Sequence, residues 1–151
     1  MNSLLKNVFT KEDLISLKQE ISAIQKTIFS QKGLLSEKAK NIAKKELFEF
    51  ILEAEKRGEI YLNLNEQFEF LENLKRKLDS LPVLKMILAF SPPLTTIEKI
   101  SQFLEKEVGR KIILDLSCNP EIIGGAILEY EGKYTNLSLA KNLEKVLKIN
   151  E

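Results

Sequence analysis

The fold of this chain is decided by residues 118–128, which read Cys118-Asn119-Pro120-Glu121-Ile122-Ile123-Gly124-Gly125-Ala126-Ile127-Leu128. Pro120 fixes its own φ and pushes Asn119 towards an extended or turn conformation. Gly124 and Gly125 allow positive φ, or a backbone approach that a Cβ would block. The apolar residues on both sides indicate a buried connection. We therefore predict a tight structural turn between two buried elements, with positive φ or close backbone packing at one glycine or both.

A pair of glycines can also form a phosphate-binding loop. Neither the G-x-x-x-x-G-K-[ST] pattern nor the G-x-G-x-x-G pattern is present here. The structural turn is therefore the favoured interpretation, and a ligand loop is the alternative.

Three blocks of this sequence occur in the order found in a known family. They are residues 89–95 (AFSPPLT), residues 120–128 (PEIIGGAIL) and residues 137–147 (LSLAKNLEKVL). Together they resemble the C-terminal domain of the F-type ATP synthase delta subunit, whose mitochondrial counterpart is the oligomycin-sensitivity-conferring protein. In that family an Asp-Pro-x-Leu-Ile-Gly-Gly segment enters a strand. The resemblance covers residues 82–151. It is fainter before them, where we count three helices and the family has six.

The resemblance also implies which residues form the two family motifs. The structural turn motif consists of Pro120, Ile122, Ile123, Gly124 and Gly125. The entry to the last helix consists of Asn136, Ser138 and Lys141. The family has Asp where this chain has Asn136, and both residue types can cap a helix. Lys141 can fill the place of a basic residue that often follows.

A structural role is what the resemblance implies for function. The expected protein is a stator (peripheral stalk) subunit of an F-type ATP synthase, linking the catalytic head to the b-subunit stalk for proton-driven ATP synthesis. Residues 82–151 would bind the b-type stalk subunit, and the N-terminal helices would bind the alpha subunits. The protein would not be a catalyst and would need no cofactor. It would lie on the inner face of the cell membrane, as part of the complex.

Composition excludes several other classes. The formal net charge is +1, and neither half has the basic excess of a nucleic-acid binder. No segment approaches the roughly 20 apolar residues that span a bilayer, so we expect no direct membrane insertion. The N-terminus lacks the apolar core of a signal peptide, so we expect a reducing, cytoplasmic compartment.

With no histidine and one cysteine, Cys118, we expect no disulfide, no zinc site and no histidine-activated nucleophile. We expect Cys118 to be a buried small hydrophobe.

Helical periodicity dominates the first half. We predict helices at residues 11–31, 36–57 and 65–80, with Thr10 and Asp13 capping the first and Ser36 capping the second. Residues 59–64 alternate briefly, which indicates a short strand or an extended linker. The first helix has one apolar stripe: Leu14, Leu17, Ile21, Ile24 and Ile28. The stripe covers barely two heptads, so bundle packing is favoured over a free-standing coiled coil.

Strand patterns begin after Leu81-Pro82. Residues 83–90 and 112–116 read as strands joined through a helix, an order that favours a parallel crossover. We predict a Thr95–Glu98 capping box for that helix and its end at Gly109. Its expected apolar face comprises Ile97, Ile100, Phe103, Leu104 and Val108. A strand at about 126–131 turns at Glu131-Gly132, and a last helix starts at about residue 138.

These patterns predict an α+β protein. Residues 1–81 form a helical bundle or hairpin, and residues 82–151 form a small mixed-sheet α/β domain.

An enzyme is supported only by the glycine pair and by Glu129 and Glu131, which share one face of a strand. We expect these two carboxylates to lie on a solvated face with Lys133 as a partner. The alternative to a stator is a self-associating helical adaptor, supported by the stripe of the first helix.

Overall fold

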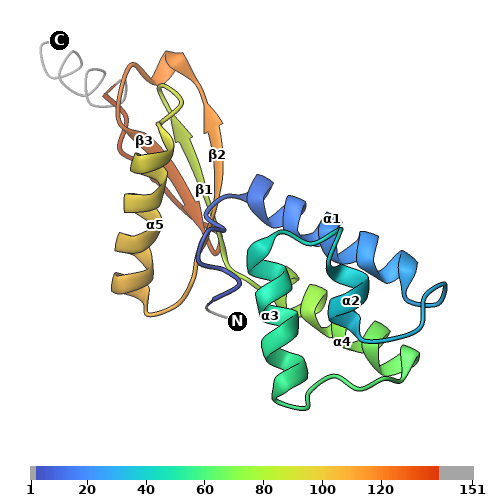
Figure 1. Ribbon diagram of the computed structural model, residues 1–151. Coiled ribbons are helices and arrows are strands. Elements are labelled where there is room, and N and C mark those ends of the chain that lie inside the picture. Colours follow the sequence, from blue (N-terminus) through green and yellow to red (C-terminus); the bar gives the residue numbers. More distant parts are fainter. Residues whose placement is uncertain (1–2, 140–151) are drawn as a thin grey trace, which may run out of the picture. The chain divides into compact units, whose positions relative to one another are not determined.

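The computed structural model describes residues 3–139 and has an α+β fold (Figure 1). Backbone contacts divide the chain into two units, each of which is described by itself. The helical unit comprises Met1–Val8 and Glu12–Ser80, and the sheet unit comprises Phe9–Lys11 and the chain from Leu81 onward. A helical part followed by a small mixed sheet is what the sequence predicts, so the fold class is confirmed.

The helical unit contains four described helices, one more than predicted. They are α1 (Lys11–Thr27), α2 (Leu35–Ala39), α3 (Lys45–Lys56) and α4 (Leu64–Asp79). The stripe of the first helix is buried as predicted, with no member more than 9% exposed: Leu14, Leu17, Ile21, Ile24 and Ile28. The other helices of this unit also bury apolar side chains, among them Leu35, Leu47, Ile51, Leu71 and Leu78. The short alternating segment before α4 is a linker, not a strand.

The continuous helix predicted at residues 36–57 is wrong. The Ala39 carbonyl accepts hydrogen bonds from the amides of both Ile42 and Ala43, which turns the chain out of α2. Lys44 then has an extended conformation and serves as the N-cap of α3. Its amide donates to Glu20 Oε2 at 2.9 Å, so a carboxylate from α1 satisfies a backbone group at the break. No glycine or proline marks this position in the sequence.

The predicted cap at Ser36 is also wrong. The N-cap of α2 is Leu34, whose amide donates to Glu37 Oε2 at 3.1 Å. Ser36 is buried inside the first turn, and its amide donates to Glu55 Oε1 at 2.9 Å. A side chain from α3 thus replaces the local cap that the sequence favoured.

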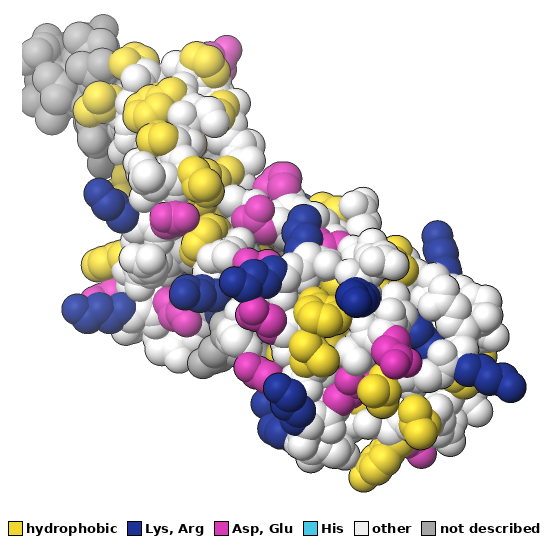
Figure 2. Space-filling model, viewed as in Figure 1, with side chains coloured by type: hydrophobic (Ala, Val, Ile, Leu, Met, Phe, Trp, Pro, Cys, Tyr) yellow, Lys and Arg dark blue, Asp and Glu magenta, His cyan; other side chains and the backbone are white. Residues whose placement is uncertain are grey.

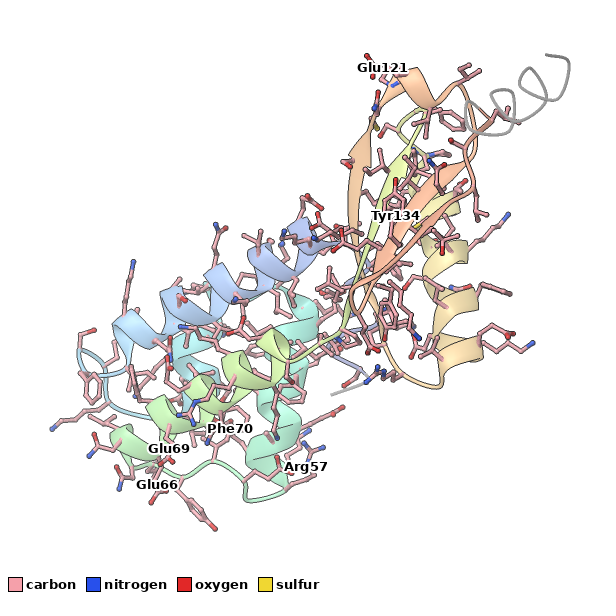
Figure 3. All side chains as sticks on the ribbon, turned by 180° about the vertical axis from the view of Figure 1, so that it is seen from behind. Arg57, Glu66, Glu69, Phe70, Glu121 and Tyr134 are labelled. Carbon is pink, nitrogen blue, oxygen red and sulfur yellow. The ribbon has the colours of Figure 1, made fainter. Side chains whose placement is uncertain are left out.

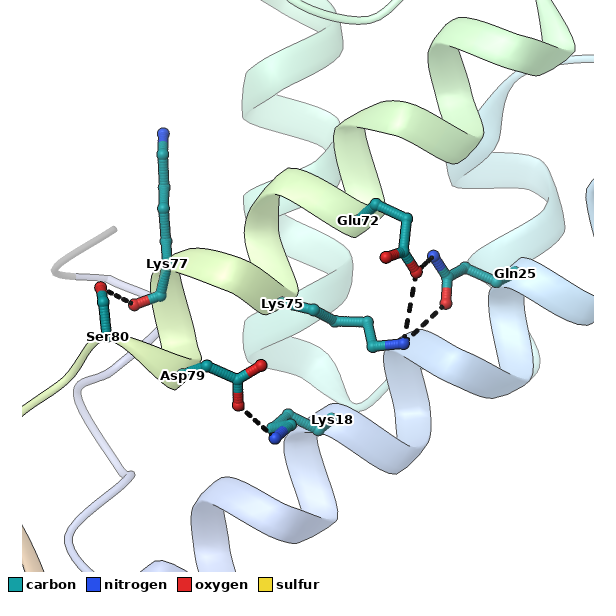
Figure 4. A network of polar contacts seen from close by, with 7 residues as sticks. All are labelled: Lys18, Gln25, Glu72, Lys75, Lys77, Asp79 and Ser80. Atoms are coloured by element: carbon teal, nitrogen blue, oxygen red, sulfur yellow. Dashed lines mark hydrogen bonds and ion pairs between the residues drawn. The ribbon is translucent and has the colours of Figure 1, made fainter.

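Polar side chains join α1 to α4 on the outside of the helical unit (Figure 4). Gln25 Nε2 donates to Glu72 Oε1 at 2.7 Å, and Lys75 Nζ lies 3.3 Å from both Glu72 Oε1 and Gln25 Oε1. Lys18 forms an ion pair with Asp79. The hydrogen bonds from Gln25 and then Lys75 lower the pKa of Glu72 below its ordinary value. These contacts fix the rotation of α4 relative to α1.

A four-stranded mixed sheet forms the centre of the sheet unit. Its strands are β1 (Val83–Leu88), β2 (Ile113–Cys118), β3 (Ala126–Tyr130) and β4 (Lys133–Asn136), in the spatial order β2-β1-β3-β4. β1 pairs in parallel with β2 and antiparallel with β3, and β3 and β4 form a hairpin. Helix α5 (Leu94–Val108) connects β1 to β2, which confirms the parallel crossover. The core between α5 and the sheet is built on Leu84, Met86, Ile112 and Leu114.

Two predicted turns of the sheet unit are confirmed. Gly109 ends α5 with φ of 73°, in the left-handed region that glycine adopts without steric cost. Glu131 and Gly132 both have positive φ, 48° and 76°, as a two-residue hairpin requires. The hairpin thereby fixes the register in which Tyr130 faces Lys133.

A short segment near the N-terminus extends the sheet beyond β2. Thr10 forms a parallel bridge with Leu114, and the Leu114 amide donates to the Phe9 carbonyl at 2.9 Å. Lys11 Nζ lies 2.9 Å from Asp115 Oδ2, and Lys111 Nζ lies 4.8 Å from the centroid of the Phe9 ring. Residues from the start of the chain therefore cover the edge of β2, which the local sequence pattern did not indicate.

Three expectations for the sheet unit are wrong. Helix α5 begins at Leu94 with Pro93 as its N-cap, so Thr95 lies inside the first turn and makes no cap. Phe103 and Val108 are 62% and 44% exposed, because they lie on the side of α5 that faces away from the sheet. Cys118 is exposed, since it ends β2 beyond the part of the strand that α5 covers.

The junction near Leu81-Pro82 stays a prediction, and limited proteolysis tests it. The chain changes there from α4 to β1, with Leu81 in a bend between them. We expect brief digestion to leave a stable fragment that begins near residue 82, identified by mass spectrometry. Cleavage spread evenly through both parts would contradict the boundary.

Candidate docking surface

The glycine turn begins with a compact cap at the end of β2. The Asn119 amide donates to the Leu88 carbonyl at 2.8 Å, and Asn119 Oδ1 accepts from the Glu121 amide at 3.0 Å. Pro120–Ile122 then forms a single turn of 3₁₀ helix, for which the fixed φ of proline is suited. The Ile122 side chain is buried, so the turn is anchored in the sheet unit. Figure 3 shows Glu121 at the outer tip of this turn.

Ile123 has an unusual backbone conformation. Its φ is 65° and its ψ is −43°, and the Gly124 amide donates across it to the Ile122 carbonyl at 2.7 Å. This is a three-residue γ-turn of the strained kind, and a β-branched residue rarely adopts positive φ. The Ile123 side chain is 63% exposed. The turn therefore projects an apolar side chain into solvent from a strained backbone.

The two glycines have different roles. Gly125 has φ of 80°, and a Cβ there would overlap the Leu137 carbonyl oxygen. The prediction of positive φ and close backbone packing is therefore confirmed at Gly125. Gly124 does not have positive φ, and a Cβ there would lie 2.8 Å from Leu139 Cδ1.

The entry to the last helix packs directly on this turn. Asn136 Oδ1 accepts from the Ser138 amide at 2.9 Å, while its role as the cap of the last helix stays a prediction. The Leu137 amide donates to the Ala126 carbonyl at 2.8 Å, and the Leu139 amide donates to the Gly124 carbonyl at 2.9 Å. The two predicted motifs thus form one structure, a link that the sequence did not reveal. Lys141, the third residue of the entry motif, and the rest of the predicted last helix lie outside the described residues.

An exposed group of large apolar side chains surrounds the combined motif. We call it the apolar end; its members are between 51% and 70% exposed: Phe90, Leu94, Ile123, Leu137 and Leu139. Phe90 lies in the connection from β1 to α5 and Leu94 is the first residue of α5; this connection leaves the sheet at the same end as the glycine turn (Figure 1). Figure 2 shows hydrophobic side chains gathered at the upper end of the sheet unit. Such groups on a surface mark interaction sites.

The sheet face away from α5 is more polar. A cavity of about 300 Å³ lies on it, and its apolar lining comprises Ile87, Ile127 and Tyr134. Lys85 bridges to Glu129 at 3.1 Å on the same face, and Asp115 is paired with Lys11. Exposed ion pairs of this kind contribute little to stability and are accessible to solvent.

Glu129 and Glu131, the candidates for an acid/base pair, are bonded to different basic residues. Glu129 bonds to Lys85, whereas Glu131 lies in the hairpin turn and accepts from Arg110 at 2.9 Å. Arg110 also donates to the Tyr130 hydroxyl, and these contacts raise the pKa of Arg110. The partner of Glu129 is therefore Lys85 and the partner of Glu131 is Arg110, whereas we expected Lys133. Within residues 3–139 no group of three potential ligand side chains could hold a metal ion.

No described helix is long and apolar enough to cross a membrane.

Comparisons with known proteins give one family. A family described as ATP synthase delta (OSCP) subunit matches residues 3–149, and so includes both units. A chain from a cryo-EM structure of the Polytomella F-ATP synthase, primary rotary state 3, is 19% identical. That similarity covers 47% of the present chain and 91% of the Polytomella chain, with a TM-score of 0.39. No curated protein matches the sequence.

Proposed function

We propose, from the premise that this chain belongs to the ATP synthase delta (OSCP) subunit family, that it joins a b-type stalk subunit to the alpha subunits of the catalytic head. As a member of that family, the protein is a structural subunit of the peripheral stalk of an F-type ATP synthase. The family match over residues 3–149 carries the proposal, because it includes the helical unit as well as the sheet unit.

The apolar end is the part of the sheet unit that best suits a stalk helix. It combines side chains from three segments of the chain: Phe90 and Leu94 around the start of α5, Ile123 between β2 and β3, and Leu137 and Leu139 after β4. An amphipathic helix binds such a surface through apolar residues spaced three and four apart. The glycine turn supports this assignment. It exposes the Ile123 side chain to solvent, and it does so although isoleucine disfavours the positive φ found at this residue.

We assign binding of the alpha subunits to the helical unit. Its four described helices form a core of their own, separate from the core under α5. The support for this partner is that the family match continues through the helical unit to residue 3.

A catalytic role has no support at this site. The two carboxylates that could have formed an acid/base pair are bonded to different cations, Glu129 to Lys85 and Glu131 to Arg110. The complex would place the protein on the inner face of the cell membrane, on the cytoplasmic side.

The self-associating adaptor has lost the observation that favoured it. Leu14, Leu17, Ile21 and Ile24 are buried within the helical unit, so this stripe is not available to a second copy.

Stalk binding can be tested by titrating the full chain with the C-terminal segment of the b-type subunit from the same genome. We expect calorimetry to show a complex in the micromolar range whose affinity falls only modestly with salt, because the contact is apolar. Phe90→Asp should weaken it about tenfold, since a charge would be buried at the contact. Val108→Asp is the matched control, as Val108 is exposed at the other end of α5. No binding at high micromolar concentration, or equal loss in both variants, would refute the assignment.

A further inference from the structure

A cavity lies between α3 and α4 in the helical unit. Its volume is about 390 Å³. The residues that line it come from α3, from the chain directly after α3 and from α4. Cavities of this size, with an apolar floor and a few polar groups at the rim, are typical of sites for small molecules.

The floor of the cavity is aromatic. The ring centroids of Phe50 and Phe70 lie 6.3 Å apart, with an angle of 26° between the planes, which is an offset stack. Phe50 is buried, whereas Phe70 is only partly buried and lines the cavity with the rest of its ring. A planar ring that enters the cavity would stack on Phe70, as nucleobases do on aromatic side chains.

Arg57 is one of two cations at the rim. Its Nε donates to Glu59 Oε1 at 2.7 Å and its Nη2 to Glu59 Oε2 at 3.4 Å, while its Nη1 lies 3.9 Å from Glu53 Oε2. The guanidinium has five donors, so these contacts leave donors for an anion. Exposed ion pairs of this kind are also weak, so an anion can compete with them. Figure 3 shows Arg57 and Phe70 on the lower side of the helical unit.

Lys77 is the second cation. Its ammonium forms no hydrogen bond or ion pair with any residue in the part of the chain that the structure describes. Figure 4 shows its side chain extended away from the polar network that joins α4 to α1. The hydrogen bond from Arg57 lowers the pKa of Glu59, and the charge of Lys77 acts in the same direction. Both cations therefore act at the same rim, and Lys77 is available to an anion.

The charges at the rim limit the kind of anion. Arg57 and Lys77 together exceed Glu59, the carboxylate that lines the cavity, by one positive charge. A single phosphate suits this balance, and its terminal oxygens can accept from both cations at once. A chain of phosphates would bring further negative charge against Glu59 and Glu53, which disfavours it.

The spacing along α4 indicates how far the phosphate lies from the ring. Phe70, Asn73, Leu74 and Lys77 line the cavity at intervals of three, four and seven residues, so they share one face of the helix. Phe70 and Lys77 are about 10 Å apart along the helix axis. A ligand that reaches both groups needs a spacer between ring and phosphate, which a ribose supplies. Asn73 lies between them, and its amide has no partner within residues 3–139, so it can pair with a polar edge of the ring.

We propose that this cavity binds a nucleoside monophosphate, with its base stacked on Phe70 and its phosphate between Arg57 and Lys77. The proposal does not rest on the stalk contact, because the apolar end belongs to the sheet unit and takes a protein partner.

Titration of the full chain with adenosine monophosphate, followed through backbone amide shifts in nuclear magnetic resonance, tests the proposal. We expect a Kd of about 0.1–1 mM, with the largest shifts at residues 57–59 and 70–77. Adenosine, inorganic phosphate and ATP are the comparison ligands. Each should bind at least about tenfold more weakly, because adenosine lacks the phosphate, inorganic phosphate lacks the base, and ATP adds charge against Glu59.

Variants locate the site. Lys77→Gln should weaken adenosine monophosphate about tenfold, since it removes a charge-assisted hydrogen bond. Arg76→Gln is the matched control, because Arg76 is the neighbouring cation on α4 but does not line the cavity. It should leave the Kd unchanged. Phe70→Leu keeps the floor apolar and should also weaken binding about tenfold, through the lost stacking.

Three results would overturn the proposal. The first is no shift at residues 57–59 and 70–77 with adenosine monophosphate at about 5 mM. The second is equal weakening by Lys77→Gln and Arg76→Gln, both of which change only a surface side chain and should keep the fold. The third is a comparison ligand that binds as tightly as the monophosphate.

Discussion

Replacing Gly125 by alanine is expected to lower the free energy of unfolding of the sheet unit by about 3–5 kcal/mol. Gly125 has φ of 80°, which by itself costs an L-residue about 1–2 kcal/mol. The added Cβ would also overlap the Leu137 carbonyl oxygen, whose peptide unit is held in place because its N–H, that of Ser138, donates to Asn136 Oδ1. Two backbone segments would have to separate, and the turn would lose its contact with the entry to the last helix.

Two other glycines provide matched controls within the same unit. Gly132 has φ of 76° but open space where a Cβ would lie, so Gly132→Ala measures backbone strain alone, about 1–2 kcal/mol. Gly124 lacks positive φ, and its Cβ would meet the flexible end of Leu139. Gly124→Ala should therefore cost about 1 kcal/mol, since the leucine side chain can move.

Hydrogen exchange of the amides in β1 and β3 measures the loss of stability of the sheet unit in each variant. Unfolding of the helical unit does not contribute to that measurement. The expected order of loss is Gly125, then Gly132, then Gly124. Equal effects at the first two positions would show that the close approach to Leu137 contributes nothing.

The same region shows why local patterns predicted its elements but not its assembly. Pro120 and the two glycines restrict the backbone conformation locally, so a stretch of eight residues was enough to predict the turn. The bond from the Leu139 amide to the Gly124 carbonyl depends on the β3–β4 hairpin, which brings the chain back after fifteen residues. No spacing rule predicts that contact. The exposure of Cys118 was missed for a related reason: alternation shows which face a residue lies on, not where the covering helix ends.

The helical unit shows the same limit. The stripe from Leu14 to Ile28 is buried as its spacing predicts, because one face of a helix must meet the core. At the break between α2 and α3, the Lys44 amide donates to Glu20, a residue that is far away in the sequence. The buried position of Lys38 was likewise unexpected, because lysine is normally on the surface and nothing local marks this one.

Replacing Gln67 by leucine is expected to cost about 3 kcal/mol or more in the helical unit. The change removes one acceptor from a buried ammonium and both donors from the carbonyls of Gly33 and Tyr61. The Lys38 ammonium would keep the Ile28 carbonyl as its described acceptor, in a site with almost no access to water. Urea unfolding followed by circular dichroism measures the loss.

A double-mutant cycle separates the charge from the rest of the network. In Lys38→Met with Gln67→Leu, no buried ammonium is left without its acceptor, so the combined loss should be smaller than the sum of the two single losses by about 1–2 kcal/mol. Simple additivity would show that Lys38 and Gln67 do not act as one unit. Lys45→Met is a control for removing a charge, because Lys45 lies on the surface of α3.

The pH dependence of stability gives an independent check on Lys38. Burial lowers the pKa of its ammonium below the ordinary value of 10.5, and the carboxylate of Glu37 acts in the opposite direction. Between the folded-state pKa and 10.5, the unfolded chain holds more protons at this lysine than the folded chain does. Stability contributed by this group therefore rises with pH across that window. Urea midpoints of the wild type and Lys38→Met should diverge there in favour of the wild type, because groups common to both titrate alike. A constant difference between the two proteins up to pH 10.5 would mean that the ammonium pays no penalty for its burial.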